Sequence, residues 1–228
     1  MTPEETAENS KSSEIAKKYG INLKKLEDEQ EKLAKELVIK DSIDFSAAER
    51  VGAIANAFFQ NKIISACIVV SPEMEVLEQE YFQDKMKFPY IPGFRAYREL
   101  PTMIEAFNKL EEKPDVFFIS GHGIAHPRLG IASHFSISTG IPTIGIADSL
   151  LVGEVKKEDI VLNGKKVGKV LQSKQGSRPL YVSPGNLISI ETAYELTKKF
   201  IKLPHKLPEP MHLANKYSKD IRKELFGG

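Results

Sequence analysis

Residues 116–149 read VFFISGHGIAHPRLGIASHFSISTGIPTIGIADS, and this stretch decides the fold. Residues 116–119 and 143–146 are short, apolar and rich in strand-forming residues, and Pro and Gly flank them. Residues 131–139, which lie between these two runs, have the character of a helix. Strand, helix and strand in this order predict a parallel β-α-β unit. Each apolar run ends in a turn rich in Gly, Pro or His, and a parallel sheet presents its functional sites at such strand ends.

The segment before this unit predicts an antiparallel meander. Strands are expected at residues 51–59, 62–70 and 75–82, because these runs are separated only by Gln60-Asn61 and by a turn at Ser71-Pro72. A helix is expected over residues 94–112. Three antiparallel strands followed by alternating helix and strand is the order of the ribonuclease H-like fold. The sequence therefore predicts an α/β protein with a mixed sheet, three antiparallel strands followed by parallel ones, flanked by helices.

The rest of the chain adds helices and one hairpin. Residues 1–20 are polar and are expected to be a disordered tail, whereas residues 21–38 carry apolar side chains near a helical period and predict an amphipathic helix. Asn163-Gly164 is the strongest short signal for a hairpin turn. Two C-terminal helices are expected near residues 189–202 and 209–226. With no internal repeat in view, residues 21–228 are expected to form a single domain with an N-terminal helix.

The composition is that of a soluble globular protein, with 41% hydrophobic and 28% charged residues in a chain of 228. No apolar run reaches the length of a membrane span, and the N-terminus is polar and acidic, unlike a signal peptide. We therefore expect a cytoplasmic location and no membrane partner. The one cysteine, Cys67, excludes an internal disulfide. A net charge of +1 gives no overall attraction to nucleic acid, so any such binding requires a local patch.

Four motifs together resemble the endonuclease V family, the repair and RNA-processing nucleases that cut near inosine. They are FPYIPGFRAYRE (88–99), GIAHPRLGIASH (123–134), IPTIGIADSL (141–150) and RPLYVSPGNL (178–187). The resemblance covers roughly residues 50–217 and implies, independently of the strand pattern, a ribonuclease H-like fold. It also implies a site at which carboxylates hold metal ions that activate water and stabilise charge on a phosphate.

Most of the chemical residues that the resemblance implies are replaced in this chain. Glu99 keeps the Glu that the family carries after the PYIPG segment, but Ala55 and Ser120 stand at the positions of two metal-binding aspartates. Two further replacements are Asp148 for a lysine and Asn215 for a histidine, with His212 as an imperfect stand-in. A single carboxylate rarely holds hydrated Mg²⁺ tightly. We therefore expect nuclease catalysis to be lost or strongly impaired.

A rebuilt metal site is the alternative. Asp148 is expected to end the strand beside the one that ends at Ser120, near enough to approach Glu99, and His122 and His126 lie in the intervening loop. Such a set of ligands would favour Mn²⁺ or Zn²⁺ over Mg²⁺. The plainer interpretation makes Asp148 a solvated strand-end residue or a helix cap.

The residues that would hold nucleic acid are better preserved. Tyr90 lies between Pro89 and Pro92, in a loop that the resemblance identifies as a wedge whose aromatic ring stacks where the strand is opened. The resemblance also implies that Gly121 and Gly123 help to form a pocket for a flipped inosine base. Further candidates for contacts with the nucleic acid are His126, Arg128, Lys165, Lys166 and the turn-like residues 183–186, and His134 completes the motif that begins at Gly123. The structural alternatives are surface packing for Tyr90, loop ordering for Arg128 and a solvated hairpin edge for the lysines.

These observations predict an endonuclease V-like protein that binds DNA or RNA, inosine-containing or unpaired, with little or no cleavage. Two alternatives stay open. One is an active metal-dependent endonuclease, using Mg²⁺ or Mn²⁺ at a site built on Glu99 and Asp148. The other is a protein-interaction scaffold, which Tyr90 and the basic hairpin make the less favoured of the non-catalytic roles.

Overall fold

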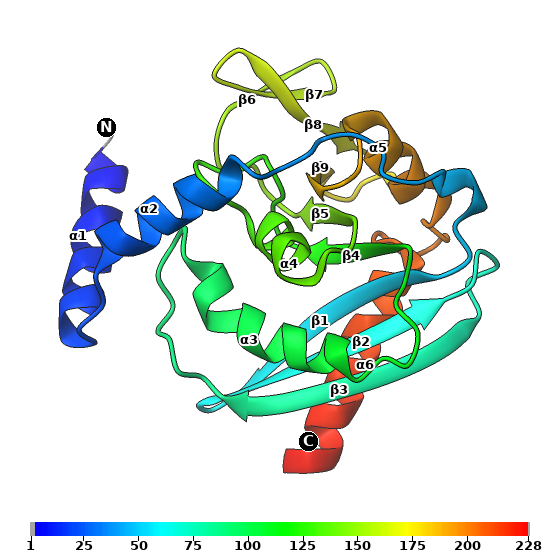
Figure 1. Ribbon diagram of the computed structural model, residues 1–228, viewed down its shortest axis with the longest axis horizontal. Helices are drawn as coiled ribbons and strands as arrows, with labels where there is room; N and C mark the ends of the chain where they lie inside the picture. The colour runs from blue at the N-terminus through cyan, green and yellow to red at the C-terminus, as the bar shows by residue number, and fades with distance from the viewer. Residues whose placement is uncertain (1–2, 228) are drawn as a thin grey trace.

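The computed structural model describes residues 3–227, and a mixed sheet of nine strands runs through it in the order β3-β2-β1-β4-β5-β9-β8-β7-β6 (Figure 1). The antiparallel meander consists of β1 (Val51–Phe59), β2 (Lys62–Val70) and β3 (Val76–Lys85). Strand β4 (Val116–Ser120) lies parallel to β1, and β5 (Thr143–Ala147) lies parallel to β4. The mixed sheet confirms the predicted ribonuclease H-like arrangement.

The other half of the sheet is antiparallel. It contains β9 (Leu180–Asn186) beside β5, and then β8 (Lys165–Leu171), β7 (Asp159–Leu162) and β6 (Glu154–Lys156). Asn163 and Gly164 join β7 to β8 with φ values of 50° and 76°, as a two-residue hairpin turn requires. The predicted hairpin is therefore confirmed.

Strand β9 corrects the expectation of a turn at residues 183–186. Ser183 pairs with Gly145 and Pro184 with Ile144, next to a register shift between Thr143 and Ile144. Proline has no amide to donate to a ladder, and such an irregularity is one of the places in a sheet that tolerates it. The turn-like composition of this segment therefore marks an irregular strand.

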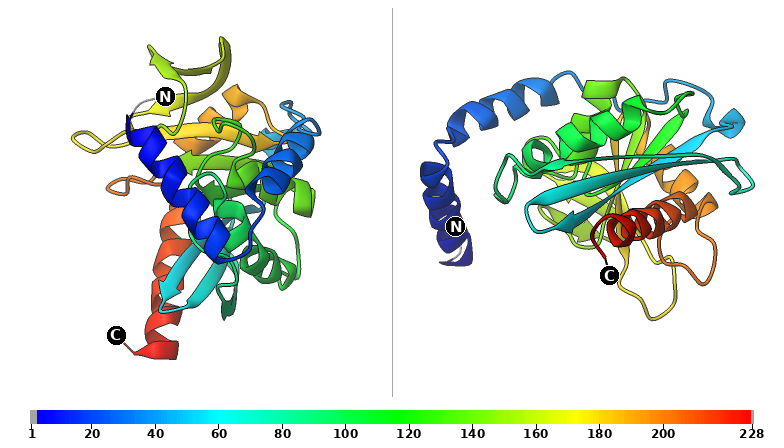
Figure 2. Two further views of the ribbon diagram at one scale, coloured as in Figure 1. Left: turned by 90° about the vertical axis from the view of Figure 1, so that its left-hand side faces the viewer. Right: turned by 90° about the horizontal axis from the view of Figure 1, so that it is seen from below.

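Helices cover both faces of the sheet (Figure 2). Helices α3 (Arg95–Asn108) and α4 (Ile131–Thr139) pack on one face, and α5 (Ile190–Lys199) and α6 (Glu209–Phe226) pack on the other. The central strand β4 serves both cores. Phe117 faces α3 and α4, where it stacks on Phe135, whereas Phe118 faces Phe200 beyond α5. Burial of both faces explains why this strand is apolar throughout.

Two N-terminal helices, α1 (Pro3–Lys18) and α2 (Leu23–Ala34), precede the sheet. Helix α1 stands at one side of the molecule (Figure 1) and corrects the expectation of a disordered tail. After Pro3 its sequence has no glycine or proline to break a helix. Its last turns also gain tertiary contacts, because Ile15 and Ala16 pack with Ile91 and Phe94 of the loop before α3. Within residues 3–227, no helix has both the length and the apolar character needed to cross a membrane.

Candidate nucleic-acid site

A pocket of about 340 Å³ lies at the carboxyl ends of β4 and β5, and we call it the strand-end pocket. It is bounded by the loop of residues 88–94, the first turn of α3 and the loop of residues 121–130. The predicted site residues that line it are Tyr90, Ser120, Gly121, His122, His126 and Asp148. Tyr90 lies at the rim with 60% of its surface exposed. A parallel sheet presents ligands to such a place, where consecutive strands end.

The loop of residues 121–130 lies flat against β9. The Gly123 amide donates to the Ser183 hydroxyl at 2.9 Å, and the Ile124 amide donates to the Pro184 carbonyl at 2.9 Å. A Cβ atom on Gly123 would overlap that same Pro184 carbonyl group. Gly123 is therefore required for packing of the loop on the sheet, and its amide is already used within the protein.

Two histidines in this loop, the half-buried His122 and the buried His126, lack positive charge at neutral pH. Burial is the main cause that lowers the pKa of His122, whose Nε2 lies 2.9 Å from the carbonyl oxygen of Ser149 and donates to it. Burial, with smaller contributions from Arg128 and His122, lowers the pKa of His126 to about 3. His126 Nδ1 accepts a hydrogen bond from the Arg128 amide at 3.1 Å, as a neutral ring can. Neither ring supplies a cation for a phosphate.

Arg128 points away from the strand-end pocket and holds α2 against the loop. Its Nε donates to Gln30 Oε1 at 2.7 Å, and its Nη1 lies 3.5 Å from Glu27 Oε1. The guanidinium also covers the ring of Phe94, 4.8 Å from its centroid. Gln30 in turn donates to the Gly93 carbonyl at 3.1 Å. These contacts support the loop-ordering role for Arg128.

Glu99 is 3% exposed, and both of its carboxylate oxygens have partners. Arg95 forms a fork on it, with Nε 2.6 Å from Oε1 and Nη2 2.9 Å from Oε2. Asn56 Nδ2 donates to Oε2 at 2.7 Å, and Asn56 Oδ1 accepts from the Ser65 hydroxyl at 2.7 Å. The Arg95–Glu99 spacing of four residues on a helix was a signal visible in the sequence.

The other residues of the expected metal centre do not gather around Glu99. Ala55 is buried in the core beneath α6, on the opposite side of β1 from Asn56, as strand alternation requires. Asp148 is exposed and lies 2.5 Å from the Nζ of Lys206. Among the side chains of residues 10–227, no three carboxylates, imidazoles or thiolates come together in a way that would hold a metal ion. This donor set does not fit a divalent metal.

The two candidates on α6 are occupied elsewhere. The ring of His212 stacks on His205 with centroids 3.5 Å apart, and His205 Nδ1 lies 2.7 Å from Glu209 Oε2. Asn215 donates to the carbonyl of Met211, in its own helix, at 2.9 Å. None of these side chains lines the strand-end pocket.

The basic hairpin consists of β7 and β8 and carries Lys165, Lys166 and Lys169. Its positive charge is largely neutralised by acidic side chains of the same protein. Lys166 Nζ lies 2.8 Å from Asp159 and 2.6 Å from Glu191, and these contacts raise the pKa of Lys166. Lys169 Nζ lies 3.0 Å from Glu191. Lys165 is exposed, and it forms no ion pair with the described side chains of residues 10–227. A phosphate at Lys166 would have to displace carboxylates.

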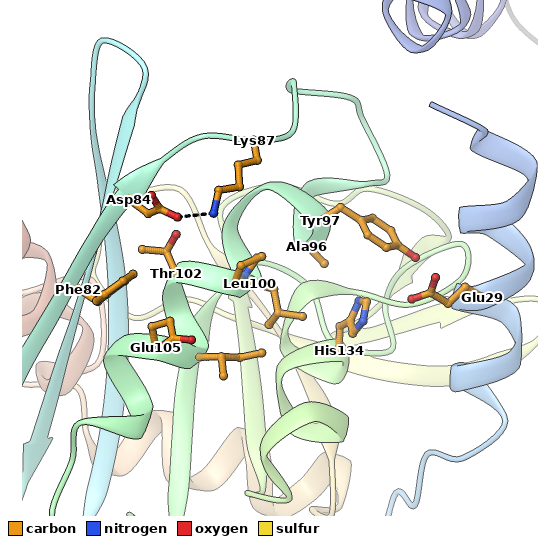
Figure 3. Close-up of a pocket in the computed structure, with 12 residues that line it drawn as sticks. Glu29, Phe82, Asp84, Lys87, Ala96, Tyr97, Leu100, Thr102, Glu105 and His134 are labelled. Carbon is orange, nitrogen blue, oxygen red and sulfur yellow. Dashed lines mark hydrogen bonds and ion pairs between the residues drawn. The ribbon is translucent and has the colours of Figure 1, made fainter. Parts of the chain in front are cut away.

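His134 faces a different hollow, of about 500 Å³, between α2, α3, α4 and β3 (Figure 3). Its ring meets that of Tyr97 edge-on with centroids 5.6 Å apart, and Glu29 reaches toward the same hollow from α2. Burial lowers the pKa of His134. This histidine therefore takes no part in the strand-end pocket.

Comparison with known sequences agrees with the motifs. The family model described as endonuclease V matches residues 31–216. Endonuclease V of Thermosipho melanesiensis is 39% identical over 184 residues, which are 77% of this chain and 81% of that protein. Endonuclease V of Archaeoglobus fulgidus is 35% identical over 212 residues, which are 90% of this chain and 96% of that protein.

Solved structures give the same result. The catalytic domain of human endonuclease V is similar with a TM-score of 0.81 and 29% identity, over 90% of this chain and 98% of that one. Ciona intestinalis endonuclease V, in complex with a DNA containing an inosine followed by a ribo-adenosine, has a TM-score of 0.82 and 25% identity, over 89% of this chain and 98% of that one. On sequence and structure together, this chain belongs to the endonuclease V family.

Proposed function

We propose that this protein binds inosine-containing or unpaired nucleic acid in its strand-end pocket and does not cleave it by the metal-dependent route. The observation that carries the proposal is the saturation of Glu99, whose two oxygens are held by Arg95 and Asn56. A metal ion would have to displace these partners, and the uncharged Ala55 and Ser120 would offer it no further charge. The strand-end pocket still has an aromatic ring, Tyr90, and polar groups such as Ser120 and His122 in its lining.

Recognition of a strand in this pocket starts at Tyr90. Its ring is free to stack with a base, because stacking requires only the flat face of any base. The interior beyond it combines apolar side chains, such as Leu129 and Ile146, with Ser120 and the glycine-rich loop. A pocket with an apolar wall and few polar groups suits a flat heterocycle. The DNA with inosine bound by the Ciona relative supports the choice of this nucleoside.

Cleavage is expected to stay at background when the purified protein is incubated with inosine-containing DNA or RNA and Mg²⁺ or Mn²⁺. The reason is that the described side chains around Glu99 form no metal site at which a bound water would be activated. The measurement is nicking of an end-labelled oligonucleotide over a range of protein concentrations. Nicking that rises with protein concentration and disappears in Glu99→Ala would show an active nuclease instead.

Tyr90→Ala is expected to weaken binding of an inosine-containing single strand by about 1–3 kcal/mol, the usual contribution of one base stacked on an aromatic ring. Fluorescence anisotropy with a labelled oligonucleotide measures the loss. Tyr19→Ala is the matched control, because Tyr19 is 58% exposed, close to the 60% of Tyr90, but does not line the strand-end pocket. Equal affinities for both variants would remove Tyr90 from the binding surface.

A further inference from the structure

Arg95 projects into the strand-end pocket from the first position of α3. Its Nε and Nη2 are bound to Glu99, whereas its Nη1 lies beside Gly121, at the end of β4, where an added Cβ would be 3.0 Å away. Nη1 has no hydrogen-bond partner among the backbone atoms of residues 3–227 or the described side chains of residues 10–227, and the Arg95 side chain is 37% exposed. Glu99 therefore fixes the guanidinium in one orientation and leaves one donor nitrogen for a ligand.

The surroundings of Arg95 favour an anion. Helix α3 has no acidic residue in its first turn and no side-chain cap, so the positive end of its dipole is uncompensated there. An arginine at this end of a helix is unfavourable by itself, and Glu99 offsets that cost. Among the described residues that line the pocket, Arg95 is the one permanent cation, and Asp148, the one acid, is already paired with Lys206.

We infer that Arg95 binds a phosphate of the nucleic-acid strand through Nη1 while Glu99 holds the other edge of its guanidinium. Glu99 is then a positioning residue. This contact places a positive charge of the protein at the carboxyl ends of β4 and β5, so phosphate binding there needs no divalent cation. Arginine suits this task because its planar fork engages a carboxylate and still presents donors to a phosphate. The inference rests on the proposed nucleic-acid binding and assigns it an anchoring residue.

The test removes both charges together. Arg95→Gln alone would leave Glu99 buried without a counter-charge, so the variant combines Arg95→Gln with Glu99→Gln. Its net charge stays at the +1 of the wild type, and the amide oxygen introduced by Glu99→Gln can still accept from Asn56. Binding of a labelled inosine-containing single strand is measured in EDTA at several salt concentrations. We expect Kd to rise roughly tenfold or more and the slope of log affinity against log salt to fall by about 0.7.

Two further variants separate the phosphate contact from folding and from general electrostatics. Arg98→Gln with Glu105→Gln makes the same change of charge on the same helix, and Arg98 stacks on Phe58 outside the pocket, so binding should not change. Arg95→Lys keeps the charge but loses the fork, so it should weaken binding and keep the wild-type salt slope. Thermal unfolding of each variant shows whether it is folded.

The outcomes are distinct. Equal binding by the wild type and the double Gln variant would overturn the role of Arg95 and leave the proposed function standing. Wild-type binding that EDTA abolishes would overturn it as well, because a metal would then carry the contact. Failure of the wild type to bind any oligonucleotide at low salt would reject the proposed function and the inference with it.

Discussion

Gly123→Ala is expected to lower the free energy of unfolding by about 3 kcal/mol or more and to abolish binding of nucleic acid. The added methyl group would overlap the carbonyl of Pro184, which is backbone and cannot rotate away. The loop of residues 121–130 would have to lift from β9, with loss of the hydrogen bond from the Gly123 amide to Ser183. Urea unfolding, followed by circular dichroism, measures the change.

Gly164→Ala is the control for this substitution. Gly164 has a φ of +76° and nothing within 4 Å of an added Cβ, so alanine there costs only the backbone preference of glycine, about 1–2 kcal/mol. It lies in the β7–β8 turn, away from the strand-end pocket. A Gly123→Ala protein as stable as Gly164→Ala would mean that the loop is free to leave the sheet.

Acid is expected to destabilise the protein through His126 by about 4 kcal/mol between pH 6.5 and pH 3. The pKa of this imidazole is about 3 in the folded chain, against an ordinary value of 6.5. Over that range the unfolded chain binds a proton that the folded chain does not, so stability rises with pH and is lost as pH falls. The groups facing His126 are the permanently charged Arg128 and the titratable His122, and both lower its pKa further.

His126→Asn should flatten this pH dependence. Asn at this position has an oxygen that can accept from the Arg128 amide, as His126 Nδ1 does, but it does not titrate. The free energy of unfolding is measured at several pH values from 7 down to the onset of acid unfolding. His122 and His134 act in the same direction in both proteins, because burial lowers the pKa of each. Identical slopes for the wild type and the variant would show that the pKa of His126 in the folded chain lies near its ordinary value.

The sheet was readable from the sequence because its signals are local. Two short connections define the meander of β1, β2 and β3, and the continuous apolar run of β4 indicates burial on both faces. Helix α1 was not predicted because its sequence shows no apolar stripe, and its contacts come from a distant loop. Strand β9 was missed because Pro184 and Gly185 have the composition of a turn.

The candidate site could be predicted only in part, because some of its contacts join residues that lie close together in the sequence and others join distant ones. The motifs placed Tyr90, Ser120 and the glycine-rich loop around one pocket. The ion pair of Arg95 with Glu99 was missed, although a spacing of four residues on a helix is typical of such a pair. In contrast, Lys206 reaches Asp148 across 58 residues, with no local pattern to predict the contact. The partners of the hairpin lysines likewise lie on another element, at Glu191. The positive charge of the hairpin lysines suggested binding of nucleic acid, but Glu191 already neutralises much of that charge within the folded protein.

The ion pairs of the β7–β8 hairpin have a consequence for the speed of encounter. Lys166 and Lys169 share Glu191, so that hairpin projects little unbalanced field, and the chain as a whole carries only +1. A polyanion would therefore approach without strong steering, at an association rate near the unsteered range of about 10⁵–10⁶ M⁻¹s⁻¹. Selectivity among nucleic-acid strands would then come from differences in their dissociation rates, because the dissociation rate depends on the contacts made after docking.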